Sequence, residues 1–322
     1  MFLALPLGAE PLRLGLFHTD LSRKGPGLLL RDIQSGRDAQ VRAVASVIAG
    51  AAVDIVVLLD VDWDYDLRTA TALRDVIGAA HYPHIFARRP NRGLSTGLDL
   101  DGDGRFGRAA DAQGFGEFSG QGGMVILSRY PVLNDDVLDF SDVLWRDFPG
   151  AITPDLGAAA GVQRLSSTGH WAVPFDVNGT VFWIMAFHAT PPVFDGPEDR
   201  NGLRNRDELR FFGQMLEGPL KHLNGAPAAI MGGANMDPTK GEGRRDGIEA
   251  LLNTPGFHDV GPAAVTVDWP DVADGQRRVD YILPAAHLGL RATGVITTEA
   301  AKAASRHRFV WVEVELPQIP SK

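Results

Sequence analysis

The sequence predicts an α/β fold, because apolar segments of strand length alternate with amphipathic helical segments along the chain. Short continuous apolar runs such as 55–59 and 181–187 are typical of strands that are buried on both faces. Most polar residues of interest follow directly after such runs, at the strand ends where layered α/β folds build their sites.

In the first half of the chain, residues 12–17 and 55–59 are apolar runs that predict two strands. Between them, Val41, Val44, Ala45 and Ile48 recur at helical spacing and predict a helix over 38–49. A second helix is expected through Leu73 and Ile77, and residues 124–127 then predict a third strand.

In the second half, residues 181–187 predict a strand that ends at His188. A helix is expected around Leu209, Phe212 and Leu216, because these residues share one helical face. The remaining predicted strands are 228–231, 279–283 and 309–316. We find no internal repeat in the sequence.

Length and composition limit the classes of function. The 322 residues show no linker, so we expect a single domain over 11–318. The net charge of -9 argues against a general nucleic-acid coat protein but leaves room for an enzyme that handles phosphate locally. The absence of cysteine excludes disulfides and zinc–thiolate sites. No apolar run reaches the roughly 20 residues of a membrane span, and the sequence does not specify an oligomeric state.

Residues 1–10 combine an apolar stretch with the small residues Gly8 and Ala9. This pattern resembles the end of a secretory signal peptide whose start is missing, and an ordinary N-terminus explains it equally well. The first interpretation predicts a periplasmic or secreted protein, and the second leaves a cytoplasmic one.

A Gly- and Asp-rich insert over 88–123 is too long for a plain turn, and loops of this length are usually functional. It contains the pattern D-x-D-x-D-G, which opens many calcium loops. The candidate calcium ligands are Asp99, Asp101, Asp103 and Asp111. Ala110 occupies the position where such loops carry a bidentate Glu, so a solvated acidic loop remains the alternative.

Six parts of the chain, read in order, resemble the endonuclease/exonuclease/phosphatase superfamily, the DNase I-like metal-dependent phosphoesterases. They are 14–20, 58–64, 122–129, 187–190, 231–238 and, jointly, 278–281 with 305–307. The segment 190–202 is similar to a bacterial, often exported branch of that superfamily. The resemblance implies a four-layer αββα sandwich of two mixed β-sheets flanked by helices. It also implies hydrolysis of phosphoesters with a divalent metal, Mg or Mn, in the cleft.

The resemblance also implies roles for individual residues. His188 matches a phosphate-contacting position, and Asn235 matches the Asn of a GDxN turn. Asp280 and His307 match an Asp–His pair in which the carboxylate orients the ring. Asp60 stands where the family has a metal-binding Glu, one methylene longer.

Three departures from the family pattern alter the expected site. His18 replaces the first-strand Asn, with Asp20 two residues later as a candidate metal ligand. Gly233 replaces the water-orienting Asp, and Arg306 replaces the Asp before the last His. Arg306 can grip phosphate but cannot activate water. Arg204, from a basic cluster in a predicted helix, is a further candidate for phosphate binding, with a solvated charged face as the alternative.

The sequence therefore supports two functions. The first is a metal-dependent phosphoester hydrolase with an altered active site, acting on a small phosphoester or another anionic substrate, with nucleic acid disfavoured by the net charge. The second is a catalytically weak or inactive relative that binds an anionic ligand or partner through the same cleft, since losing a general base commonly lowers a rate by about 10²–10⁴. A binding module stabilised only by calcium would rest on the Asp99 loop alone.

Overall fold

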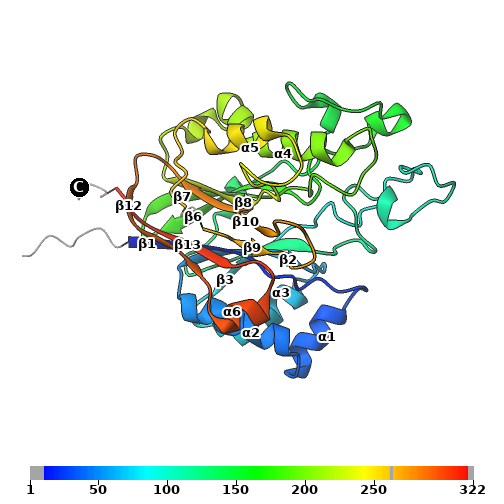
Figure 1. Cartoon of the computed structure of the whole chain (residues 1–322). Coiled ribbons are helices and arrows are strands. Elements are labelled where there is room, and N and C mark those ends of the chain that lie inside the picture. The colour runs from blue at the N-terminus through cyan, green and yellow to red at the C-terminus, as the bar shows by residue number, and fades with distance from the viewer. Residues whose placement is uncertain (1–10, 262–263, 318–322) are drawn as a thin grey trace, which may run out of the picture.

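Two β-sheets pack face to face and are covered by helices on both outer faces (Figure 1). The computed structural model describes residues 11–261 and 264–317. The stretch 1–10, the candidate remnant of a signal peptide, and residue 318, the expected end of the domain, lie outside the described residues. Both sheets contain parallel and antiparallel neighbours, so the predicted αββα sandwich of two mixed sheets is confirmed.

The first sheet has, within the described residues, six strands in the order β12-β13-β1-β2-β4-β3. They are β1 (Pro11–His18), β2 (Ile55–Val61), β3 (His84–Phe86), β4 (Gly123–Ser128), β12 (Gly289–Ile296) and β13 (Phe309–Glu315). Strand β1 runs parallel to β2 and antiparallel to β13, and His18 at its end is the register partner of Leu59.

The second sheet has five strands in the described part of the chain, in the order β11-β8-β7-β6-β5. They are β5 (Leu138–Asp139), β6 (His170–Val177), β7 (Thr180–His188), β8 (Ala228–Gly233) and β11 (Asp280–Pro284). Gly233 at the end of β8 pairs with His188 on one side and with Asp280 on the other. Strands β9 (Val267–Asp268) and β10 (Gln276–Arg277) form a separate pair.

The helices lie on the outer faces of the two sheets (Figure 1). The first sheet is covered by α1 (Leu28–Ser35), α2 (Ala39–Ala51), α3 (Arg68–Gly78) and α6 (Glu299–Ala304), and the second by α4 (Arg200–Glu217) and α5 (Arg245–Leu252). Short 3-10 helices occupy Ala109–Asp111, Asn134–Asp136, Trp145–Asp147, Gly157–Gly161 and Lys221–Leu223. Within the described residues, no helix has both the length and the apolar character that a membrane crossing requires.

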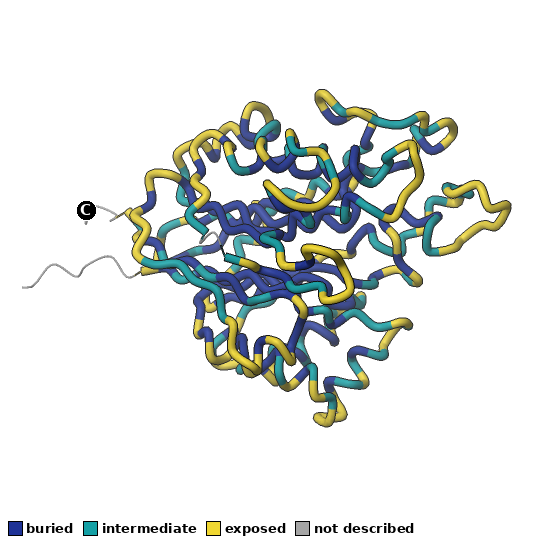
Figure 2. Tube along the Cα trace, viewed as in Figure 1, coloured by how far each residue is buried: buried dark blue, intermediate teal, exposed yellow. Residues whose placement is uncertain are grey.

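The core explains why the β2 segment reads as a continuous apolar run. Val57 and Leu59 belong to the cluster between the sheets, whereas Val56 and Leu58 belong to the cluster under α1, α2 and α3. A central strand covered on both sides must be apolar at every position. Figure 2 shows the same result, with buried backbone concentrated along the two sheets.

Several elements of the structure have no counterpart among the elements predicted from sequence, including the helices α1, α5 and α6 and the strand β12. The three helices have eight residues or fewer, which is too short for a clear helical period. Strand β12 is an edge strand whose residues are exposed or half-buried, so it lacks the apolar run that marks the central strands.

The insert 88–123 leaves the first sheet after β3 and returns at β4, although these two strands are direct neighbours. Within the insert, the described backbone forms one short 3-10 helix, Ala109–Asp111, and isolated bridges such as Arg92↔Gly114. The insert therefore adds no strand to the sheet. It places some of its side chains at the end of β2.

His170, at the start of β6, is fully buried against Phe187, Phe211 and Phe212. Its Nε2 lies 3.0 Å from the carbonyl oxygen of Glu208, so Nε2–H donates there. Its Nδ1 lies 2.6 Å from Oγ of Ser166 and accepts from that hydroxyl. Burial lowers the pKa of His170 to about 3, so the ring is neutral in the folded protein.

This burial predicts a loss of stability in acid. Between the folded pKa of about 3 and the ordinary value of 6.5, the unfolded chain binds a proton at His170 that the folded chain does not. The free energy of unfolding therefore falls as pH decreases through this window, by about 1.4 kcal/mol per pKa unit. We expect His170→Leu to show a smaller fall of Tm across the window than the wild type, measured by circular dichroism. Replacing the exposed His287 with Ala is the control, and an unchanged pH dependence in His170→Leu would contradict the assignment.

Candidate active site

Residues from both sheets meet at one edge of the sandwich. His18 ends β1 and His188 ends β7, Asn235 follows β8, and Asp280 begins β11. His307 lies two residues before the start of β13. The structure therefore brings together the residues that the resemblance implied for phosphate contact, for the Asn of the turn and for the Asp–His pair.

Asp280 and His307 form a buried hydrogen-bonded pair. Nδ1 of His307 lies 2.8 Å from Oδ2 of Asp280, and since a carboxylate accepts, Nδ1–H donates. The Nε2 atom of His307 is thereby left as the acceptor nitrogen of the neutral ring. Within the described residues, Oδ1 of Asp280 is buried and has no hydrogen-bond partner.

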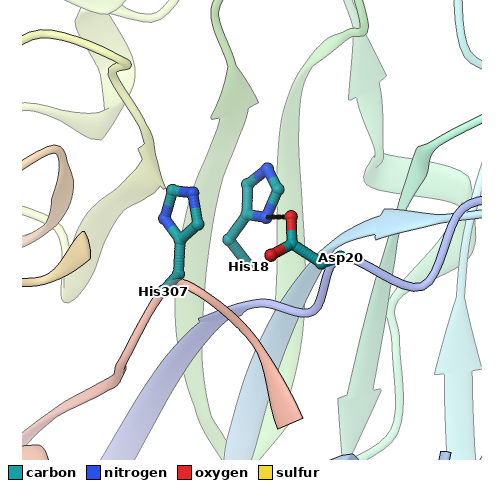
Figure 3. A group of neighbouring side chains, drawn as sticks. All are labelled: His18, Asp20 and His307. Carbon is teal, nitrogen blue, oxygen red and sulfur yellow. Dashed lines mark ion pairs between the residues drawn. The ribbon is translucent and has the colours of Figure 1, made fainter. Parts of the chain in front are cut away.

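Three imidazole rings lie in contact. The rings of His18 and His307 stack with centroids 3.9 Å apart and planes inclined by 12° (Figure 3). The ring of His188 meets His18 edge-on at 5.0 Å. In the described part of the chain, the buried Nδ1 atoms of both His18 and His188 make no hydrogen bond.

Burial and mutual repulsion keep the rings of His18 and His188 neutral. Burial, followed by the charge of His307, lowers the pKa of His18 to about 4. Burial also lowers the pKa of His188 well below its usual value, with His18 and Arg92 adding to the effect. Neutral rings offer nitrogen lone pairs at neutral pH, which suits them to bind a cation or to accept a proton.

The side chain of Asn235 is held by a hydrogen bond to the residue that follows β7. Its Nδ2 donates to the carbonyl oxygen of Ala189 at 2.8 Å and lies 3.5 Å from Nε2 of His188. Three residues of this edge have left-handed backbone: Asp20 with φ 52°, Asp60 with φ 61° and Asn235 with φ 52°. Such backbone is strained in residues other than glycine and clusters at functional sites.

Gly233, the position of the missing water-orienting Asp, is closed to a side chain. A Cβ placed on it would lie 2.9 Å from Cδ1 of Leu59 and 3.2 Å from Cδ2 of His188. The neighbouring side chains have thus taken the space that a carboxylate at this position would need.

Asp60 is paired with an arginine of the insert. Nη1 of Arg92 lies 2.6 Å from Oδ1 of Asp60, and the hydroxyl of Ser22 donates to Oδ2 at 2.9 Å. Burial favours a raised pKa for Asp60, but Arg92, His18, His188 and the Ser22 hydrogen bond together outweigh it and the pKa falls to about 2. The sequence analysis did not identify Arg92; the only signal was the cluster of arginines at the start of the insert.

Asp20 is paired with Arg306. Nε and Nη2 of Arg306 donate to the two carboxylate oxygens of Asp20 at 3.1 and 3.0 Å, and the backbone N–H of Arg306 donates at 3.0 Å. Burial favours a raised pKa for Asp20, yet the charge of His18 and the Arg306 hydrogen bonds lower it. The Arg306 side chain is 61% exposed, so its guanidinium lies at the rim of the site.

The structure places two sets of predicted residues elsewhere. Arg204 is buried in α4 and donates to the carbonyl oxygens of Leu165 and Arg164, both at 2.8 Å, so its donors face the protein rather than the cleft. In the insert, Asp99, Asp101 and Asp103 each have an oxygen within 4.8 Å of the others. Asp111 is not part of that group, and its carboxylate accepts the backbone N–H groups of Leu100 and Arg108.

Magnesium prefers oxygen ligands in near-octahedral geometry at about 2.1 Å. The two carboxylates expected to hold it, those of Asp20 and Asp60, are each occupied by an arginine. Two of the unpartnered buried atoms here, in His18 and His188, are imidazole nitrogens. The residues present therefore do not fit a magnesium ion held as the resemblance implies.

The chain matches the Endonuclease/Exonuclease/phosphatase family over residues 32–307. Its structure is similar to that of an endonuclease/exonuclease/phosphatase from Beutenbergia cavernae DSM 12333, with a TM-score of 0.62 and 19% identity over 95% of this chain and 72% of that one. It is also similar to the human Nocturnin catalytic domain, with a TM-score of 0.56 and 14% identity over 95% of this chain and 94% of that one. Sphingomyelinase C from Streptomyces griseocarneus follows, with a TM-score of 0.53 and 16% identity over 94% of this chain and 99% of that one.

At these identities the structural likeness shows the shared fold alone. No curated protein matches the sequence. The family match, however, spans most of the chain and every element that contributes to the candidate site except the β1 end. The chain is a member of the endonuclease/exonuclease/phosphatase family, whose members act on phosphoesters.

Proposed function

We propose that this chain is a metal-dependent phosphoester hydrolase whose active site has departed from magnesium chemistry. The observation that carries the proposal is the buried Asp280–His307 pair at 2.8 Å, which lies beside His18 and His188. Proton transfer to or from a phosphoester requires an oriented imidazole with further hydrogen-bonding side chains beside it, and this site has both.

His307 is the candidate group for proton transfer. Asp280 fixes its tautomer and increases the basicity of the ring, so that Nε2 can take a proton from water or give one to a leaving oxygen. Asn235 and His188 supply further polar atoms next to it, 3.5 Å from each other. These side chains would hold the phosphate oxygens while the proton moves.

Arg306 would contribute charge at the entrance. Its guanidinium is exposed at the rim and already spans two carboxylate oxygens of Asp20, a geometry that also matches two oxygens of a phosphate. The structure of the human Nocturnin catalytic domain contains a sulfate anion, which supports anion binding in this fold. The net charge of -9 favours a small phosphoester over nucleic acid as the substrate.

A second function is favoured by the two carboxylate–arginine pairs. With Asp60 held by Arg92, Asp20 held by Arg306 and Gly233 lacking a carboxylate, the site retains anion-binding groups but few groups that could activate water. A catalytically weak relative that binds an anionic ligand through this cleft would have these properties.

Hydrolysis of bis-p-nitrophenyl phosphate, p-nitrophenyl phosphate and plasmid DNA separates the two functions. We expect metal-dependent release of p-nitrophenol by the wild type and a loss of about 10²–10⁴ in rate for His307→Ala, because the proton-transferring ring is removed. His287→Ala, an exposed histidine outside the site, should retain the wild-type rate. No turnover with any divalent metal, together with retained phosphate binding, would support the second function instead.

Asp280 is a positioning residue in this proposal, and Asp280→Asn tests that role. We expect kcat to fall with little change in KM, since the amide no longer fixes the reactive tautomer of His307 while the shape of the pocket is kept. The pH profile of kcat should change as well, which a purely structural role would not produce. Asp246→Asn, in an exposed ion pair with Arg206, is the matched control. Equal losses in both variants would contradict the role of Asp280.

Calcium binding by Asp99, Asp101 and Asp103 stays a prediction, and Asp111 is left out of its ligand set by the structure. If the loop binds calcium, a chelator should lower the Tm of the wild type but not that of Asp101→Asn, which removes a ligand charge. The measurement is differential scanning calorimetry with and without added Ca²⁺. Identical melting curves for the wild type in both conditions would count against the site.

A further inference from the structure

We propose that His18, His307 and Asp20 form a site for a divalent transition metal of the Zn²⁺ class, in place of the magnesium site of the family. This inference rests on the proposed function, since it names the metal that the altered site would use. It follows from the donor atoms, from two buried histidine nitrogens that make no hydrogen bond within the described residues, and from the groups that hold the donors.

The donor atoms are close enough to share one ion. His18, Asp20 and His307 each offer a ligand atom within 4.8 Å of the others, before any adjustment of the side chains (Figure 3). Two imidazole nitrogens and one carboxylate oxygen are ligands that Zn²⁺ and its neighbours accept. His188, in edge contact with His18 at 5.0 Å, is a candidate fourth ligand.

Two histidines at this edge have a buried Nδ1 atom that makes no hydrogen bond within the described residues, and Nδ1 of His18 lies 3.5 Å from Oδ1 of Asp20, the carboxylate of the same group (Figure 3). Both atoms are themselves buried, and as whole residues His18 and His188 are 8% and 4% exposed. Buried polar atoms without a partner are rare in folded proteins and call for an explanation such as an ion. A metal bound at this position would supply the missing partner.

His307 is arranged as a metal-binding histidine commonly is. Its Nδ1–H donates to Asp280, which leaves Nε2 as the coordinating atom. A carboxylate behind the imidazole fixes the tautomer and increases the basicity of the ligand. Asp20 is also held from behind, because Ser305 donates to its Oδ2 at 3.1 Å.

Two adjustments are needed for an ion to bind. The rings of His18 and His307 are nearly parallel at 3.9 Å, whereas a metal lies in the plane of each ring that binds it. His18 is the ring that can rotate, since its side chain makes no hydrogen bond within the described residues and its 3.5 Å ion pair joins it to Asp20, another proposed ligand of the same ion. Arg306 must also release an oxygen of Asp20, and its 61% exposed side chain can move into solvent. Arg306 therefore competes with the metal for Asp20.

Metal binding can be measured without any substrate. The chain is first treated with a chelator, and Co²⁺ is then followed by its visible absorption and Zn²⁺ by calorimetry. We expect one Co²⁺ per chain, displaced by Zn²⁺ but not by a large excess of Mg²⁺. His18→Ala and His307→Ala should each weaken Zn²⁺ binding by at least about 10-fold. His287→Ala should not change it.

The arginine gives a test in the opposite direction. Arg306→Ala should strengthen Zn²⁺ binding, because a competitor for Asp20 is removed. Arg291→Ala is the matched control. Arg291 lies on the edge strand β12 and forms an exposed ion pair with Glu315, the last residue of β13. Asp20→Asn should also weaken Zn²⁺ binding. Because this substitution preserves the side-chain shape, it tests the site even if the histidine variants fail to fold.

Two results would overturn the inference: equal Zn²⁺ affinity in the wild type, His18→Ala and Asp20→Asn, or Mg²⁺ binding as tight as Zn²⁺ binding. The inference and the proposed function can fail separately. Zn²⁺ bound at this site without hydrolysis of any phosphoester would support the metal site and contradict the hydrolase. Metal-dependent hydrolysis by a chain that binds Zn²⁺ no more tightly than Mg²⁺ would support the hydrolase and contradict the metal site.

Discussion

The hydrogen bond between Asp280 and His307 joins the two sheets at the edge where the site forms. Asp280 belongs to β11 of the second sheet, and His307 precedes β13 of the first. Both side chains are buried, so loss of either one would leave the other polar group without a partner in a dry environment, at a cost of about 1–3 kcal/mol or more. The orientation of His307, the ring stacked on it and the access to Nε2 all depend on this contact.

Two carboxylates near this pair, those of Asp20 and Asp60, each form an ion pair with an arginine. In the family pattern, a metal ion would serve Asp60 and its neighbours. Here Arg92 serves Asp60 and Arg306 serves Asp20, with ion-pair distances of 2.6 and 3.0 Å. A buried carboxylate needs a cation beside it, which can be a metal ion or an arginine. The arginines therefore compensate the carboxylate charge that a metal ion would compensate in the family pattern.

The insert has a structural role in this change. It brings Arg92 to Asp60 across the end of β2, and Gly122 makes the contact sterically feasible. The backbone of Gly122 has φ 57°, and a Cβ there would lie 2.2 Å from Nη1 of Arg92 and 2.5 Å from Oδ1 of Asp60. Only glycine tolerates both the left-handed backbone and the close approach of the ion pair.

The sequence by itself determined the layered fold and the central strands, because apolar periodicity is a local property, and its resemblance to a known family indicated the Asp–His pair. The edge strand β12 escaped prediction since partial exposure removes that periodicity. The partner of Asp60, the inward direction of Arg204 and the contact of Arg306 with Asp20 were decided only by the tertiary structure. These contacts join residues 32, 39 and 286 positions apart, and the path of the intervening chain, which no local pattern encodes, sets which side chains meet.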